Sequence, residues 1–134
     1  MSEEADVAST GIRAIVAGHG AFATGIISAV DQITGHGHVF RAISNRGLCL
    51  DDIQELLNQT LDETGAKVIF TDLPAGSCTM AVRRLLRGRP GVSLITGINL
   101  ALLLDFALNE SADAAAAALT ALERGKASMV AHGT

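Results

Sequence analysis

Residues 12–20 of this 134-residue chain read IRAIVAGHG, and they decide the fold. The run from Ala14 to Ala17 is short, apolar and followed by glycine, which is typical of a buried β-strand. From Ala21 to Ile33 apolar side chains recur at helical spacing, and Gly35 then ends the pattern. A buried strand that turns through glycines into an amphipathic helix predicts the opening of a βαβ unit.

The same alternation of strand and helix continues along the chain. Further strands are expected at residues 38–44, 67–71 and 92–96, and helices at about 51–63, 77–87, 99–108 and 111–124. Residues suited to capping mark the starts of these helices, namely Asp51 or Asp52, Ser77, Asn99 and Ser111. Four alternations predict an α/β domain in which a mainly parallel sheet of about four to five strands has helices on both faces.

Length and composition limit the domain organisation and the class of protein. We assign residues 12–134 to a single domain and expect residues 1–11 to be a disordered tail. The net charge of -4 and the absence of Trp and Tyr argue against nucleic-acid binding. The acidic start is unlike a secretory signal, and the longest apolar run, around 98–108, is too short to span a bilayer. We expect a cytoplasmic protein in which Cys49 and Cys78 are reduced thiols.

The histidine between two glycines is the first candidate for chemistry. Gly18 and Gly20 let the backbone bend around His19 and leave room for a ligand, while the following helix start favours an anion such as phosphate. A histidine there can act as a nucleophile through one ring nitrogen, and its other nitrogen needs a partner that fixes the tautomer. Asp72 and Gly97 follow other strands of the parallel sheet, so they are expected on the same rim, with Asp72 as that partner.

Other interpretations of these residues stay open. His19 is otherwise a loop histidine without a chemical role, and Asp72 a turn residue. Residues 18–23, GHGAFA, satisfy a loose dinucleotide-binding fingerprint, although the second strand ends without an acidic residue for a ribose. Ser77 is a candidate helix cap, a candidate ligand of phosphoryl oxygens, or both, because a helix N-cap lies at the anion-binding end.

Three ordered blocks resemble the IIA proteins of the mannose-type (mannose/fructose/sorbose/N-acetylgalactosamine) phosphotransferase system, abbreviated PTS. The blocks are AIVAGHGAFATGII at residues 14–27, VIFTDLPAGS at 68–77 and ITGINLALLL at 95–104. The likeness covers about residues 12–125 in consistent order. It implies a flavodoxin-like, doubly wound sheet and a homodimer.

The resemblance also implies roles for individual residues. His19 would be the phosphorylated nucleophile and Asp72 the residue that orients it. Gly20, Gly76 and Ser77 would bind the phosphoryl group. The intermediate would be a covalent phosphohistidine, with no cofactor and no metal.

The same resemblance implies the partners and the reaction. The phosphocarrier HPr would donate the phosphoryl group, a IIB component would accept it, and a membrane permease would take up the sugar that IIB phosphorylates. The chain would thus be a phosphotransferase of sugar phosphorylation. Two alternatives are a regulatory IIA-like protein that signals by its phosphorylation state, and a small-molecule or nucleotide-binding module.

The second block departs from the family pattern at two positions. Ala75 replaces the first glycine of the usual Gly-Gly-Ser turn, and its Cβ is expected to narrow or reshape the loop. Cys78 replaces a proline, and it is interpreted either as a small buried apolar side chain or as a redox-sensitive thiol near the phosphohistidine.

Two further clusters of side chains lie outside the blocks. His36 and His38 form an HxH motif at the far end of the first helix, and we interpret them as solvated turn residues rather than metal ligands. Arg83, Arg84 and Arg87 are either a solvated helix face or a docking surface for an acidic or phosphorylated partner.

Overall fold

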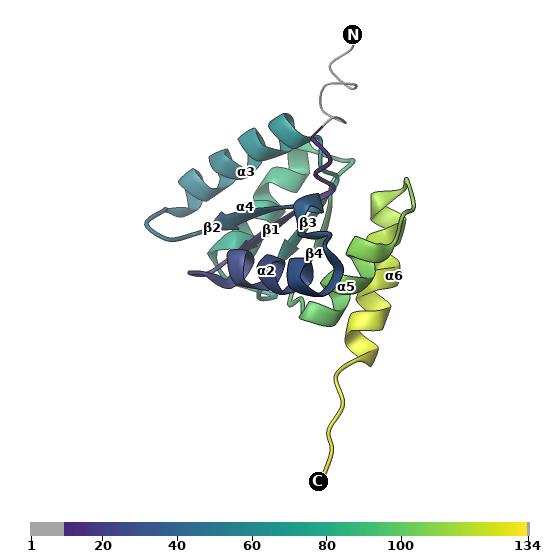
Figure 1. Ribbon diagram of the computed structural model, residues 1–134. Coiled ribbons are helices and arrows are strands. Elements are labelled where there is room, and N and C mark those ends of the chain that lie inside the picture. Colours follow the sequence, from purple (N-terminus) through teal and green to yellow (C-terminus); the bar gives the residue numbers. More distant parts are fainter. Residues whose placement is uncertain (1–9, 134) are drawn as a thin grey trace.

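Four parallel strands form the centre of the computed structural model, which describes residues 10–133 (Figure 1). The strands are β1 (Ala14–Gly18), β2 (Phe40–Ser44), β3 (Val68–Thr71) and β4 (Ser93–Ile95). The helices are α2 (Phe22–Thr34), α3 (Leu50–Thr64), α4 (Ser77–Leu85), α5 (Leu100–Leu108) and α6 (Ala114–Ala127), with short 3-10 turns η1 (Gly37–Val39) and η2 (Leu86–Gly88). The predicted tail falls mostly on residues 1–9, which lie outside the described residues.

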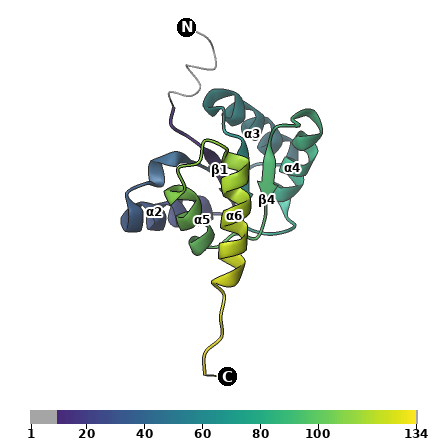
Figure 2. The same ribbon diagram turned by 90° about the vertical axis from the view of Figure 1, so that its right-hand side faces the viewer.

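The central strand β1 divides the core into two halves. All five of its residues are buried, and successive side chains point to opposite faces of the sheet. Ala14 and Val16 pack with α2, α5 and α6, whereas Ile15 and Ala17 pack with α3 and α4. Burying a Val or Ile side chain contributes about 1.5–3 kcal/mol, so a strand buried on both faces is strongly favoured to be apolar. The predicted α/β fold with helices on both faces is confirmed (Figure 2).

The strand order places two loops beside each other. The order is β2-β1-β3-β4, so the chain moves one way from β1 to β2 and the other way from β3 to β4. This is the first part of the flavodoxin-like order, in which ligands bind beyond the carboxyl ends of the strands at the β1/β3 switch point. Ala17 of β1 lies opposite Thr71 of β3. The residues that follow these two strands therefore meet at the switch point.

The longest apolar run of the sequence forms α5, which packs closely against α6. A Cβ at Gly125 of α6 would lie 2.7 Å from the Cβ of Leu102, so glycine lets the two helices approach. The amide of Asn99 also donates to the carbonyl of Gly125 at 2.9 Å. Among residues 10–133, no helix is both long and apolar enough to cross a membrane.

The predicted helix caps were right for α5 and wrong for α6. Asn99 caps α5, accepting a hydrogen bond from the backbone N–H of Leu102 at 2.9 Å. Ser111 does not cap α6, because its hydroxyl accepts from the N–H of Asp113 in a preceding turn. Asp113 is the actual cap and accepts from the N–H of Ala116 at 3.1 Å.

The start of α3 was also misplaced. Cys49 is its N-cap, so Asp51 and Asp52 both lie inside the first turn. The Asp52 carboxylate reaches back to the N–H of Cys49 at 3.4 Å, which completes a capping box. An acidic residue thus acts at the third helical position instead of at the cap.

Candidate functional site

His19 and Asp72 meet at the switch point of the sheet. His19 directly follows β1 and Asp72 directly follows β3. Asp72 Oδ2 accepts from the backbone N–H of His19 at 2.9 Å and lies 2.8 Å from His19 Nδ1. A proton on Nδ1 that is donated to this carboxylate leaves the lone pair of Nε2 free. The His19 side chain is 47% exposed, so the ring is open to an approaching molecule.

The charge of Asp72 suits its contact with Nδ1 of His19. Burial raises the pKa of its carboxyl, but hydrogen bonds from the backbone and ring of His19, together with the charge of that ring, more than offset it. The net result is a pKa below the ordinary value. Asp72 is therefore an ionised acceptor at neutral pH, and its two bonds to His19 argue against a simple turn residue.

Gly18 makes room for this pair. A Cβ at Gly18 would lie 3.0 Å from Asp72 Oδ2 and 2.7 Å from the Phe22 ring. Any larger residue would push the carboxylate away from the backbone of His19. The first glycine of the Gly-His-Gly motif is thus needed for the close approach of the two loops.

The beginning of α4 lies against the other edge of the imidazole. Gly76 is the N-cap of α4, with a φ of 112°, and a Cβ there would lie 3.3 Å from His19 Cε1 and 3.8 Å from Nε2. The first N–H groups of a helix have no partner within it and favour an anion. An anion bonded to Nε2 would therefore face the N-terminus of α4.

Gly76→Ala is expected to damage the site without unfolding the domain. The positive-φ backbone conformation costs a non-glycine residue about 1–3 kcal/mol, and the new Cβ would crowd the edge of the ring formed by Cε1 and Nε2. We expect a lower melting temperature. We also expect a loss of phosphoryl transfer that is larger than the unfolded fraction of the variant can account for. Ala75→Gly in the same loop is the matched control, and equal transfer by the Gly76 variant and wild type would contradict this account.

Ser77 does not cap α4, contrary to the prediction. It is the first residue of the helix and makes no cap hydrogen bond. Its hydroxyl instead accepts from the side-chain amide of Asn45 at 3.0 Å. The backbone N–H of Asn45 donates to the carbonyl of Gly18 at 3.1 Å, so Asn45 joins the end of β2 to both sides of the site. The sequence reasoning missed Asn45, whose only signal is its position directly after a strand.

Two buried threonines hold the loop between β3 and α4. The hydroxyls of Thr71 and Thr79 lie 2.7 Å apart, and Thr79 donates to the carbonyl of Leu73 at 2.6 Å. Both side chains are almost completely buried, so these hydrogen bonds are shielded from water. The loop that carries Asp72 and Gly76 is therefore fixed from beneath.

The two departures from the family pattern are accommodated. Ala75 is exposed, and no non-glycine residue among residues 10–133 has a positive φ, so its Cβ is neither strained nor directed into the core. Cys78 is fully buried. Burial, followed by the charge of Asp72, raises the pKa of its thiol to about 11, although a hydrogen bond with Ser77 opposes this. Cys78 therefore fits the interpretation as a small core side chain, because redox-sensitive thiols need a thiolate and access.

The remaining predicted residues lie as follows. Gly97 reaches the same rim, where a Cβ would lie 3.8 Å from Pro74 Cδ. The rings of His36 and His38 lie 5.7 Å apart at the other end of α2. Within residues 10–133, no group of three or more His, Cys, Asp or Glu side chains is placed to hold a metal ion.

The arginine cluster on α4 and η2 is partly paired. Arg84 forms an ion pair with Asp51 at 3.1 Å, so part of that helix face is already neutralised.

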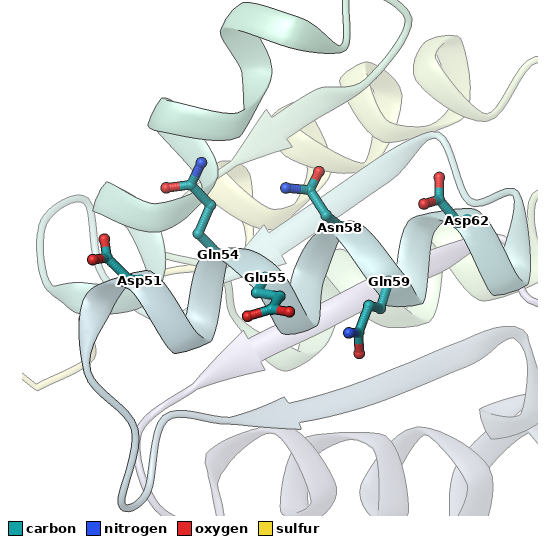
Figure 3. Close-up of a pocket in the computed structure, with 6 residues that line it drawn as sticks. All are labelled: Asp51, Gln54, Glu55, Asn58, Gln59 and Asp62. Carbon is teal, nitrogen blue, oxygen red and sulfur yellow. The ribbon is translucent and has the colours of Figure 1, made fainter.

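A polar hollow of about 410 Å³ lies along α3, and His19 is not among the residues that line it (Figure 3). Its lining comes from one helix and consists of Asp51, Gln54, Glu55, Asn58, Gln59 and Asp62. Pockets for small molecules are usually enclosed and mostly apolar, and this one is neither. It gives no support to a small-molecule or nucleotide-binding module.

The sequence matches a known family over a long range that includes the residues of this site. The family model for the PTS system fructose IIA component, the mannose-type IIA family, matches residues 13–123, which include the histidine, the aspartate and the α4 loop. The chain belongs to this family. The predicted resemblance is confirmed, and family membership makes the chain a phosphocarrier component of a sugar phosphotransferase system.

Solved structures of this kind share the fold. The mannose/sorbose-specific IIA subunit from Enterococcus faecalis is 16% identical, with a TM-score of 0.77 over 92% of this chain and 96% of that one. The PTS IIA protein associated with the fucose utilization operon of Streptococcus pneumoniae is 21% identical, with a TM-score of 0.76 over 89% and 91%. Component EIIA from Streptococcus agalactiae is 22% identical, with a TM-score of 0.72 over 90% and 96%. Comparison with curated protein sequences gives no match.

Proposed function

We propose that His19 is the residue that carries the phosphoryl group, and that it carries it on Nε2. The observation that supports this best is the 2.8 Å contact between His19 Nδ1 and Asp72. It leaves the opposite nitrogen free, on a half-exposed ring beside the start of α4. HPr is the proposed donor, and a IIB component the proposed acceptor.

The proposed step exchanges one N–P bond for another. The lone pair of His19 Nε2 forms a bond to phosphorus while the N–P bond of the donor phosphohistidine breaks, and the donor nitrogen keeps that electron pair. The proton on Nδ1 stays in place, so the phosphorylated ring gains positive charge. The ionised carboxylate of Asp72 balances this charge at 2.8 Å. Transfer to IIB reverses these changes.

The surrounding residues have matching roles in this proposal. Backbone N–H groups next to Gly20 and at the Gly76–Ser77 turn face the phosphoryl oxygens, since both turns open helices beside the ring. The Ser77 hydroxyl is held by Asn45 and is available as a further donor. Positioning and charge stabilisation supply the catalysis, as is general for phosphoryl transfer.

The family supports the partners and the setting that we propose. The protein would work in the cytoplasm, between HPr and a IIB component that serves a membrane sugar permease. A homodimer is part of the same proposal, and sedimentation analysis of the purified chain would test it.

The decisive experiment is incubation with HPr, its kinase and phosphoenolpyruvate, read by intact mass. We expect one acid-labile phosphoryl adduct that depends on all three components. An established IIA protein in parallel reactions is the control. Absence of the adduct while that control is fully labelled would refute the proposed function.

A further inference from the structure

The turn after β2 brings an arginine to the glycine that follows His19. Arg46 lies in this turn, and its Nη2 would be 3.3 Å from a Cβ placed on Gly20. Gly20 is the residue directly after His19, and consecutive Cα atoms are only about 3.8 Å apart. The guanidinium of Arg46 thus lies beside the backbone of the phosphate-accepting turn, at the start of α2.

Hydrogen bonds attach the turn that carries Arg46 to both of the loops that form the site. Asn45 donates through its backbone to Gly18, which precedes His19, and through its side chain to Ser77 of α4. The N–H of Arg46 donates to the Ser44 hydroxyl at 3.1 Å. These bonds hold the Arg46 backbone in a defined place, although its side chain is exposed.

The guanidinium of Arg46 is not engaged in holding the described part of the fold together. Most other arginines among residues 10–133 are engaged, with carboxylate or carbonyl partners at Arg13, Arg41, Arg84, Arg89 and Arg124. Within the described residues, the guanidinium of Arg46 has no hydrogen bond and no ion pair. A cation held beside an anion-binding turn, yet without an anionic partner, is suited to an anion that arrives during the reaction.

We propose that Arg46 binds the phosphoryl group on His19 and stabilises it as a third positive element, beside the starts of α2 and α4. The inference rests on the proposed role of His19. Arginine suits the task because its fork of N–H groups matches two phosphoryl oxygens and its charge persists at all relevant pH values. A phosphoryl group on nitrogen is dianionic above its last pKa, and Asp72 adds another negative charge nearby. Arg46 would offset this concentration of negative charge.

The test uses chemical phosphorylation, so that it does not depend on HPr. Phosphoramidate transfers its phosphoryl group to imidazole nitrogen and releases ammonia. Phosphorus NMR then follows the phosphohistidine signal with pH, and the signal missing from His19→Ala identifies His19. We expect Arg46→Gln to raise the pKa of this phosphoryl group by about one unit, because a nearby cation favours the dianion. Arg46→Lys should lie between Arg46→Gln and wild type.

Arg87→Gln is the matched control, because Arg87 is an exposed arginine in η2, beyond the C-terminal end of α4, and the variant has the same net charge as Arg46→Gln. Identical titrations of the Arg46→Gln and Arg87→Gln proteins would overturn the proposal. So would the lack of any His19 signal in the wild type, since that would mean that Nε2 cannot carry a phosphoryl group.

Transfer from phospho-HPr separates phosphoryl binding from partner docking. If Arg46 holds the phosphoryl group, Arg46→Gln should shift the equilibrium of the exchange toward phospho-HPr by about tenfold, as expected for one charge-assisted hydrogen bond. A docking residue would change the rate and leave this equilibrium unaltered, which would overturn the proposal. If HPr fails to label the wild type while the chemical titration depends on Arg46, the phosphocarrier role fails and phosphoryl binding by Arg46 stands.

Discussion

His19→Ala is expected to abolish the acid-labile phosphoryl adduct completely, which is the largest effect of any single substitution in this protein. The imidazole of His19 is the only group at the switch point with a free, exposed nitrogen lone pair among the described residues. Under the proposed function, its removal leaves the transferred group without a nucleophile. The measurement is intact mass after incubation with HPr, its kinase and phosphoenolpyruvate.

The control for this variant is His36→Ala, which removes an exposed imidazole at the opposite end of α2. We expect this control to be labelled like wild type. His19 is half-exposed, so its replacement should leave the far-ultraviolet circular dichroism spectrum unchanged. A folded His19→Ala protein that still accepts one phosphoryl group would assign the role to a different residue.

Asp72→Asn is expected to have the second-largest effect, slowing transfer by about 10²–10⁴-fold. The amide is nearly isosteric, but it lacks the negative charge that balances the phosphorylated ring. It can also present an N–H to Nδ1, which would favour the wrong tautomer of His19. Quenched-flow measurement of transfer from phospho-HPr gives the rate. A wild-type rate would remove Asp72 from the mechanism.

Stability measured against pH provides an independent check on Asp72. Its pKa is lowered in the folded state, so the ionised carboxylate stabilises the fold above the ordinary Asp value of about 3.9. That contribution is lost as the pH falls through the lower, folded value. The difference in melting temperature between wild type and the Asp72→Asn protein should therefore shrink as the pH falls below about 3.9. A difference that does not shrink in that acidic range would contradict the pairing.

Local sequence signals located most of the fold and half of the site. The apolar run of β1, its glycine ending and the amphipathic α2 were readable because each depends on neighbouring residues. Asp72 was reachable because all strands of a parallel sheet end on one rim. The capping role of Ser77 was wrong for a tertiary reason, since Asn45 from another turn engages its hydroxyl.

The amino-acid sequence by itself determined the order of the elements, the apolar strands and the placement of His19 at a strand-to-helix turn. These features follow from hydrophobic spacing and from glycine positions within a few residues. Only the tertiary structure decided which ring nitrogen is free, because that depends on a carboxylate 53 residues away along the chain. It also decided that Arg46 meets Gly20, since a contact across two loops depends on strand register and turn geometry that no local pattern contains.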